Sequence, residues 1–470
     1  MKESLVALGF TALPGLPVFA APPKWKPDRK PSITFGILTD THLMTEWDAK
    51  SIYRTMSLDY IRNAYAHFKE MKVDAVLHLG DAAHRAQVRT LQFHREEFDK
   101  AFGTDNPPPL LLVDGNHEWQ GDWDFLKNLY KDPALFKENV LTEDFPRLFE
   151  KGWGVKYERM WHKQVKGFHF FGRGWHVDNG EFGKFIKGEA ERCNLKGEKP
   201  FFILSHKMTY WGCNSQLKDY PNAIGFCGHW HTSLSNWGNI YYERNYKLFP
   251  YINCGACRYD GENGLDQKWL KERPASQRDS VDNHFEYPSR QGLVVSVYDG
   301  LGVVMDRREF GNGGRLGPRW VFPVGKFETK PYSRETLTKK IGTPEFSSKA
   351  KIDVSKVQMP ARGEKPGKGD KQQKEPGVRI DIPMASANSN SRVFAYDVVV
   401  MVDNDPKKRF FKSVYFSGVN CGIGREPDGG VTTVEIPLAE LPAGKKLVVA
   451  VRPISSLGTK GRAIATKFNV

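Results

Sequence analysis

The stretch ITFGILTDTH, residues 33–42, decides the fold of this chain. It is a short apolar run that changes abruptly to polar residues. The same change occurs in DAVLHLGD (residues 74–81) and in PLLLVDGNHE (residues 109–118). A short apolar run bounded by polar and turn-forming residues is typical of a buried β-strand. Each of these segments is therefore predicted to be a strand with polar side chains at its carboxyl end.

Three later segments follow the same pattern, and helical segments separate some of the strands. The later segments are FHFFGRGW (168–175), FFILSHK (201–207) and AIGFCGHWH (223–231). Residues 51–71 and 90–102 have apolar side chains at helical spacing. Alternating strands and helices predict a layered α/β core, whose ligand site lies beyond the carboxyl ends of the strands.

The pattern changes after the last of these strands. Residues 255–290 are polar and Gly-rich and are predicted to form a long loop, and residues 290–310 a β-hairpin that turns at Asp299-Gly300. A Pro-, Gly- and Lys-rich run at 360–377 is predicted to be a flexible loop or linker. The segments beyond it alternate like the strands of a small β-sandwich that resembles fibronectin type III or immunoglobulin-like modules. If residues 351–354 are its first strand, the basic run is an internal loop.

The bulk composition limits the function classes. With 470 residues the chain is expected to hold two or three domains, and 40% hydrophobic and 26% charged residues fit a globular protein. The net charge of +14 favours an anionic partner. No nucleic-acid-reading module accompanies that charge, so specific nucleic-acid recognition is not expected. Cys254 and Cys257 lack a second pair at zinc-site spacing, and buried thiols or one disulfide are expected there.

The first 21 residues predict an export signal. A short polar start precedes an apolar stretch from Leu5 to Phe19, with small residues suited to cleavage after Ala20. The stretch is too short and too broken by Pro and Gly to span a bilayer, and no other segment is apolar enough to do so. A periplasmic or extracellular location is therefore predicted, with a disordered N-terminal tail as the alternative. We expect domains at residues 30–340 and 345–470.

Five short blocks of polar residues close the predicted strands. They are Asp40-Thr41-His42, Gly80-Asp81, Gly115-Asn116-His117-Glu118, His206 and Gly228-His229-Trp230-His231. Each block alone is common by chance, and a lone His after an apolar run is more often a core residue than a ligand. Five such blocks in order at one edge of the predicted sheet form a strong signal, because chance would require five independent coincidences.

These blocks resemble those of the calcineurin-like metallophosphoesterase superfamily, over roughly residues 32–330. The resemblance implies a four-layer αββα core and two metal ions. It also implies that Asp40, His42 and His231 hold the first ion, that Asn116, His206 and His229 hold the second, and that Asp81 bridges them. Imidazoles with carboxylates suit Mn, Zn or Fe rather than Mg or Ca.

The same resemblance implies a reaction. A hydroxide formed on the metals would attack the phosphorus of a phosphate mono- or diester, and His117 would assist the leaving group. The alternative for His117 is to orient a neighbouring ligand. Arg85, His84, Trp230 and His176 are candidate substrate contacts; a solvated helix start explains the first two equally well, and an aromatic rim the others.

A different class of function remains open. The chain could be a non-catalytic, metal-containing protein whose β-sandwich binds a surface glycan or a partner. The complete set of candidate ligands argues against it, because a pseudoenzyme is expected to have lost at least one. The sequence leaves open the natural substrate, the metal pair, the choice between mono- and diesters, and the oligomeric state.

Overall fold

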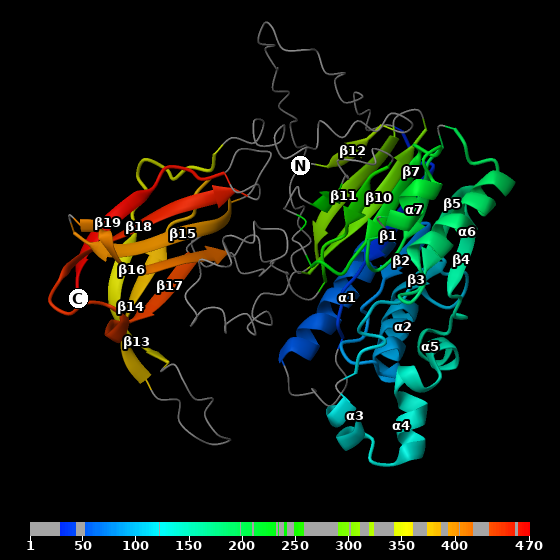
Figure 1. Ribbon diagram of the computed structural model, residues 1–470, viewed down its shortest axis with the longest axis horizontal. Helices are drawn as coiled ribbons and strands as arrows, with labels where there is room; N and C mark the ends of the chain where they lie inside the picture. The colour runs from blue at the N-terminus through cyan, green and yellow to red at the C-terminus, as the bar shows by residue number, and fades with distance from the viewer. Residues whose placement is uncertain are drawn as a thin grey trace, which may run out of the picture.

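The computed structural model of the chain is shown in Figure 1. It describes residues 29–43, 52–121, 123–197, 199–208, 211–231, 234, 239–241, 249–257, 290–299, 302–310, 319–323, 343–360, 374–386, 393–403, 405–416, 432–455 and 459–470. The predicted export signal lies outside these residues. So do most of the predicted loop after Gly255 and the glycine of the predicted hairpin turn.

Two six-stranded sheets form the α/β core (Figure 1). The first contains, in order across the sheet, β12 (Trp320–Phe322), β11 (Gly302–Glu309), β10 (Gln291–Tyr298), β1 (Ile33–Leu38), β2 (Ala75–Leu79) and β3 (Leu110–Val113). The second contains β4 (Met160–Val165), β5 (Phe168–Arg173), β6 (Phe201–Leu204), β7 (Ala223–Cys227), β9 (Tyr251–Asn253) and β8 (Ile240–Tyr241). Both sheets are mixed: β1, β2 and β3 run parallel in one, and β5, β6, β7 and β9 in the other. All six strands predicted from the first sequence segments are present, and β10 and β11 form the predicted hairpin.

The two sheets pack face to face through one apolar cluster. Phe35 of β1 meets Phe170 of β5 edge-on, with ring centroids 5.3 Å apart, and Phe202 of β6 at 4.9 Å. All three rings are fully buried within a cluster that draws residues from both sheets. Edge-to-face aromatic pairs add to the free energy gained by burying apolar surface. This contact therefore sets how the ends of the two sheets face each other.

Helices cover the outer faces of both sheets. The helical segments are α1 (Ile52–Glu70), α2 (Val88–Phe102), α3 (Trp123–Leu129), α4 (Pro133–Asn139), η2 (Leu141–Glu143), α5 (Phe145–Trp153), α6 (Asn179–Arg192) and α7 (Trp211–Gln216). Side chains of α1, α2 and α5 pack in one outer cluster, and those of α6 and α7 in another. Gly36 in β1 lets Phe68 of α1 approach, because a Cβ there would lie 2.6 Å from the ring. The predicted layered α/β core is confirmed.

Antiparallel sheets follow the α/β core. One contains β13 (Asp353–Pro360), β14 (Lys374–Ile382) and β17 (Thr432–Pro437), and the other β16 (Asp405–Phe416), β15 (Val393–Val402), β18 (Lys446–Ser455) and β19 (Ile464–Asn469). A short 3₁₀ segment, η7 (Leu438–Glu440), follows β17. Side chains of both sheets share one apolar cluster. β13 pairs with β14, so the basic run connects neighbouring strands of one sheet, as the alternative of an internal loop predicted. Residues 361–373 of this run lie outside the described residues, and its last residues belong to β14. The alternation of apolar residues did not reveal β16 or β19.

Two further observations concern expectations from composition. Cys254 and Cys257 are both buried free thiols, as one of the two sequence alternatives predicted. None of the helices in the described part of the chain is both long and apolar enough for a bilayer span.

The aromatic contact between the sheets generates a first prediction. Replacing Phe35→Ala should lower the free energy of unfolding by about 3–5 kcal/mol, because the change leaves a cavity between the two sheets. Phe35→Leu is the matched control and should cost less than half as much, since it retains most of the volume. Urea denaturation followed by tryptophan fluorescence measures both changes. Equal and small losses in both variants would contradict the role assigned to this contact.

Candidate metal centre

All five polar blocks follow strands of the core. Three follow the parallel strands β1, β2 and β3 of the first sheet, and two follow β6 and β7 of the second. Parallel neighbouring strands present their carboxyl ends at the same edge of a sheet. The face-to-face packing of the sheets brings both edges together. We name the resulting group the dimetal cluster; it consists of Asp40, His42, Asp81, Asn116, His206, His229 and His231.

The first half of the dimetal cluster is formed by Asp40, His42 and His231. The Nε2 of His231 lies 2.9 Å from Oδ1 of Asp40 and 3.1 Å from Nε2 of His42. His42 Nε2 is 3.8 Å from the same carboxylate oxygen. All three side chains are buried. Two imidazole nitrogens and a carboxylate oxygen thus point toward one common position.

The second half is formed by Asn116, His206 and His229. The side-chain oxygen of Asn116 lies 3.0 Å from Nδ1 of His229 and 3.2 Å from Nε2 of His206. The two imidazole nitrogens are 3.3 Å apart. Again, atoms that carry lone pairs converge, and here a neutral amide oxygen takes the place of the carboxylate.

Asp81 joins the two halves. Its Oδ2 lies 3.1 Å from Nε2 of His206 and 3.6 Å from Nε2 of His42. Its Oδ1 accepts a hydrogen bond of 2.8 Å from the backbone N–H of His117. Asp81 belongs both to the group with Asp40, His42 and His231 and to the group with His206 and His229. The donor atoms therefore fit a pair of divalent ions bridged by one carboxylate.

The electrostatics of the dimetal cluster favour binding of cations. Burial lowers the pKa of His42 to about 3 and that of His229 to about 4, so both rings are neutral and able to coordinate a metal. Burial opposes a charge at His206 as well, but Asp81 and Asp40 outweigh it and raise the pKa of His206 to about 10. Without metal, a protonated His206 neutralises part of the carboxylate charge. Metal binding would replace that proton.

The backbone around the cluster adopts an uncommon conformation. The described chain has ten non-glycine residues with positive φ, and five of them belong to the dimetal cluster. These five are Asp40 (51°), His42 (41°), Asp81 (51°), His229 (71°) and His231 (49°). Such conformations are unfavourable for residues with a Cβ and persist only where the surrounding structure imposes them. Sharp turns at the strand ends thus direct these side chains toward the cluster.

Glycines beside the ligand candidates allow close approach. A Cβ on Gly115 would lie 2.2 Å from Oδ1 of Asp81, and one on Gly228 would lie 2.3 Å from Oδ2 of Asp40. Either contact is far below van der Waals distance and would displace a carboxylate. The glycines of the third and fifth blocks are therefore required by packing against the first and second blocks.

Hydrogen bonds hold the ligand candidates in orientation. His206 Nδ1 donates to the carbonyl oxygen of Leu79 at 2.8 Å, which leaves Nε2 free to coordinate. The Thr39 hydroxyl donates to Oδ2 of Asp40 at 2.6 Å. The backbone N–H of His229 donates to the same oxygen at 3.0 Å. The same N–H also reaches Oδ1 of Asp40 at 3.2 Å, and Oδ1 faces Nε2 of His231 at 2.9 Å.

Glu118 is an organising residue to which the sequence interpretation assigned no role. Its buried carboxylate accepts hydrogen bonds from the backbone N–H groups of Asp81, Ala83 and Gly115, at 2.9, 2.8 and 2.7 Å. It thereby ties the second block to the third. Burial and the charge of Asp81 raise the pKa of Glu118 to about 8. The sequence did contain a signal for this role, because Glu118 is an acidic residue of the third block to which no ligand role was assigned.

Asp114 organises the other side of the third block and was also missed. It accepts hydrogen bonds from Nε1 of Trp119 at 2.6 Å and from the backbone N–H of Trp175 at 3.0 Å. Trp175 in turn lies against the rings of His206 and His229, at centroid distances of 5.8 and 5.5 Å. Asp114 thus places an aromatic wall beside the second half of the cluster. Its position at a strand end, like that of Asp40, was the sequence signal.

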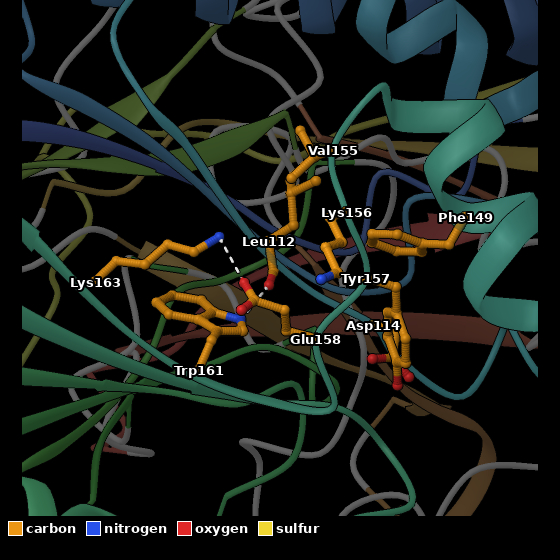
Figure 2. Close-up of a pocket in the computed structure, with 9 residues that line it drawn as sticks. All are labelled: Leu112, Asp114, Phe149, Val155, Lys156, Tyr157, Glu158, Trp161 and Lys163. Atoms are coloured by element: carbon orange, nitrogen blue, oxygen red, sulfur yellow. Dashed lines mark hydrogen bonds and ion pairs between the residues drawn. The ribbon is translucent and has the colours of Figure 1, made fainter.

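A small separate pocket lies behind Asp114. Figure 2 shows Asp114 next to Tyr157, with a Lys163–Glu158 ion pair of 3.2 Å on the far side of the pocket. The indole of Trp161 donates to the carbonyl oxygen of Leu112 at 2.9 Å. No member of the dimetal cluster lines this pocket. The pocket is therefore not the predicted site, and the residues that line it pack beside β3.

His117, the predicted leaving-group residue, lies beside the first half of the cluster. Its ring meets that of His42 edge-on at 4.5 Å and stacks on that of His84 at 5.5 Å. His117 Nδ1 donates to the carbonyl oxygen of His84 at 2.9 Å. A carbonyl oxygen can only accept, so Nε2 is the nitrogen that can gain or lose a proton. His84 is thus brought next to His117, as the prediction of a common site requires.

The remaining candidate substrate contacts occupy different surroundings. The guanidinium of Arg85 lies over the ring of Phe125 in α3, 4.1 Å from its centroid. Trp230 is half-buried with its ring edge-on to His229. His176 is exposed and meets the ring of Trp119, whereas the preceding Trp175 faces His206 and His229. Substrate roles for these three residues stay predictions.

Solved structures of phosphatases resemble this chain at low identity. A dimetal phosphatase from Danio rerio is 14% identical, and the match covers 64% of this chain and 100% of that one with a TM-score of 0.36. The phosphoesterase Yfce from E. coli is 9% identical, with 62% and 99% covered and a TM-score of 0.28. The purple acid phosphatase PPD1 from yellow lupin (Lupinus luteus) seeds is 13% identical, with 61% and 53% covered and a TM-score of 0.39. No curated protein matches the chain.

The model of one sequence family matches the part of the chain that carries the cluster. This family is the calcineurin-like phosphoesterases, and the match spans residues 33–233. That span begins at β1 and includes all seven members of the dimetal cluster. Residues 33–233 thus form a calcineurin-like phosphoesterase domain, and its Asp/His cluster is consistent with a phosphoesterase hydrolase.

Proposed function

We propose that this protein is a dinuclear-metal phosphoesterase that hydrolyses a phosphate mono- or diester. The observation that carries the proposal is the position of Asp81, whose carboxylate lies within reach of both histidine groups. One carboxylate between two sets of nitrogen and oxygen donors fits two divalent ions side by side. The donor set has no thiolate and three neutral oxygen or nitrogen ligands in its second half, which favours Mn, Zn or Fe.

The residues of the chain would prepare the site for in-line displacement at phosphorus. When two ions are bound, they supply Lewis-acid polarisation of the phosphoryl oxygens and acidify water. Asp81 and Asp40 hold the negative charge that attracts the ions, and their hydrogen bonds keep each carboxylate in one orientation. Because the site is already ordered by strand ends and buried hydrogen bonds, little reorganisation is needed during the reaction.

His117 is positioned to assist the leaving group. Its Nδ1 is engaged by the carbonyl oxygen of His84, so the proton delivered to the leaving oxygen comes from Nε2. His84 also stacks against the His117 ring and limits its rotation. A protonated His117 would neutralise the alkoxide that forms as the ester bond breaks.

The surroundings of the cluster favour an anionic substrate. Lys207 follows the ligand candidate His206, and its ammonium lies 5.9 Å from the ring centroid of Trp175. Trp175 forms one wall beside His206 and His229. A cation and an aromatic face next to the metal site can together hold a phosphate group and an apolar or aromatic substituent.

Metal reconstitution tests the proposal directly. The purified protein would be stripped of metal, loaded with Mn, Zn or Fe, and assayed with p-nitrophenyl phosphate and bis-p-nitrophenyl phosphate. We expect turnover that depends on added metal and is absent from the stripped protein. The ratio of the two rates separates a monoesterase from a diesterase. Two tightly bound ions with no turnover of either ester would favour the binding-protein alternative.

The shared carboxylate generates a prediction with a matched control. Asp81→Asn should reduce kcat/KM by at least about 100-fold, because the amide nitrogen cannot bind a metal ion. Replacing a residue that only orients a metal ligand already lowers activity or metal affinity by about 10–100-fold. The variant should stay folded, since Asn retains the oxygen that accepts from His117. Asp132→Asn is the control: it preserves the N-cap of α4 and should leave turnover unchanged. Turnover like that of the unchanged protein in Asp81→Asn would refute the bridging role.

The role of His117 is separable by leaving group. His117→Ala should slow esters of poorly acidic alcohols by about 10²–10⁴-fold, the usual contribution of a general acid. The loss for p-nitrophenyl esters should be much smaller, because p-nitrophenolate leaves without protonation. Steady-state kinetics with an alkyl and a p-nitrophenyl ester measure the difference, and His67→Ala serves as a control on α1. Equal losses with both esters would indicate that His117 only orients its neighbours.

A further inference from the structure

A second cluster of metal-binding side chains lies outside the dimetal cluster. His162 of β4, His169 of β5 and Cys193 at the end of α6 bring their ligand atoms within 4.8 Å of one another. All three side chains are half-buried. We name this group the outer His/Cys cluster. None of the five sequence blocks contributes to it.

The hairpin register explains how the two histidines meet. His162 pairs with Phe171 and His169 pairs with Gln164 across β4 and β5. The two histidines are therefore diagonal neighbours on one face of the hairpin. Nε2 of His162 lies 2.8 Å from Nδ1 of His169. The ring of His162 also stacks on Phe171 at 4.5 Å, which fixes its plane.

A carboxylate orients the first histidine. Nδ1 of His162 lies 2.7 Å from Oε2 of Glu189, one turn before the end of α6. Glu189 is itself paired with Arg192. An ionised carboxylate can only accept, so His162 donates through Nδ1 and turns the lone pair of Nε2 toward His169 and Cys193. A carboxylate behind an imidazole is the usual support of a zinc-binding histidine.

We propose that the outer His/Cys cluster is a zinc site, with Nε2 of His162, Nδ1 of His169 and Sγ of Cys193 as ligands and solvent in the fourth position. Two imidazoles and a thiolate match the ligand preferences of Zn²⁺. Two nitrogens bound to a tetrahedral zinc ion lie roughly 3.4 Å apart, so the present 2.8 Å separation would open by about half an ångström. On binding, the Cys193 thiol releases its proton to solvent, and the proton on Nδ1 of His169 moves to Nε2 of the same ring, so both imidazoles bind as neutral rings.

The charges around the site are compatible with a cation. Two basic residues, Lys199 and Arg192, lie near His169. Arg192 is balanced by Glu189, and a Cys193 thiolate would balance a second positive charge. The C-terminal end of α6 adds the negative end of a helix dipole, which favours a cation there.

The position of the site indicates a structural role. β5 runs parallel to β6 and β7, and therefore from the hairpin toward the edge that carries the dimetal cluster. Helix α6 follows β5 in the chain and packs in one apolar cluster with it. His169 lies four residues before the end of β5, roughly 13 Å of strand from that edge. Zinc would therefore fasten the end of α6 to the hairpin on the side away from the dimetal cluster. Its loss should affect stability and metal content, with phosphoester turnover largely unchanged.

Cobalt substitution tests the proposal on the full-length protein. The stripped protein would be loaded with Co²⁺ under reducing conditions, and Cys193→Ser compared with the unchanged protein. We expect the unchanged protein to show a near-ultraviolet thiolate-to-cobalt charge-transfer band. Cys193→Ser should lack this band and should bind one metal equivalent per chain less than the unchanged protein. Lys184→Ala, at an exposed position of α6, is the control and should retain both. Glu189→Gln should weaken binding at this site by about 10–100-fold.

A second variant keeps the test decisive if Cys193→Ser folds poorly. Cys193→His retains a zinc ligand, so it should keep the additional metal equivalent while losing the thiolate band. Asp81→Asn should lose metal from the dimetal cluster and keep the band, which separates the two sites. The proposal is overturned if the unchanged protein shows no thiolate band and Cys193→Ser binds as much metal. The cluster would then be a hydrogen-bonded histidine pair beside a free thiol.

Discussion

The carboxylate of Asp81 imposes the central constraint on this structure. One of its oxygens must reach histidines from both sheets, while the other accepts a hydrogen bond from the loop after β3. This is possible only if the carboxyl ends of β1, β2 and β3 face those of β6 and β7 across the core. The aromatic contact of Phe35 with Phe170 and Phe202 supplies that arrangement. The geometry of the polar cluster therefore depends on the apolar packing between the two sheets.

The cluster is costly to build in the absence of metal. Asp40 and Asp81 are buried carboxylates, and burial alone would raise their pKa values; nearby histidines lower them instead. Five cluster residues also have backbone conformations that side chains with a Cβ disfavour. The surrounding hydrogen bonds from Glu118 and Thr39, with the large apolar clusters on both sides, offset these terms. A site held this rigidly is ready to receive cations without rearrangement.

The β5–α6 unit connects the two metal-binding regions inferred for the chain. At its catalytic end, Asp114 holds the backbone of Trp175 and places its ring beside His206 and His229. At its other end, Cys193, which directly follows α6, lies close to His169 of β5. A ligand at the outer cluster would thus restrain the same unit that forms one wall of the phosphoester site. The two proposed metal-binding regions thus lie at opposite ends of this β5–α6 unit.

The sequence by itself predicted eight strands of the α/β core, namely β1, β2, β3, β5, β6, β7, β10 and β11, and the polar blocks that follow five of them, because both are local signals. An apolar run predicts burial, and an acid or histidine directly after it lies at a strand end whatever the neighbouring strands are. The roles of Glu118 and Asp114 depended on which loops touch, and only the tertiary structure decided that. The outer His/Cys cluster joins residues 162, 169 and 193 through hairpin register and the return of α6, neither of which periodicity encodes. Pairing across sheets is a long-range property, and single-sequence patterns report only short-range ones.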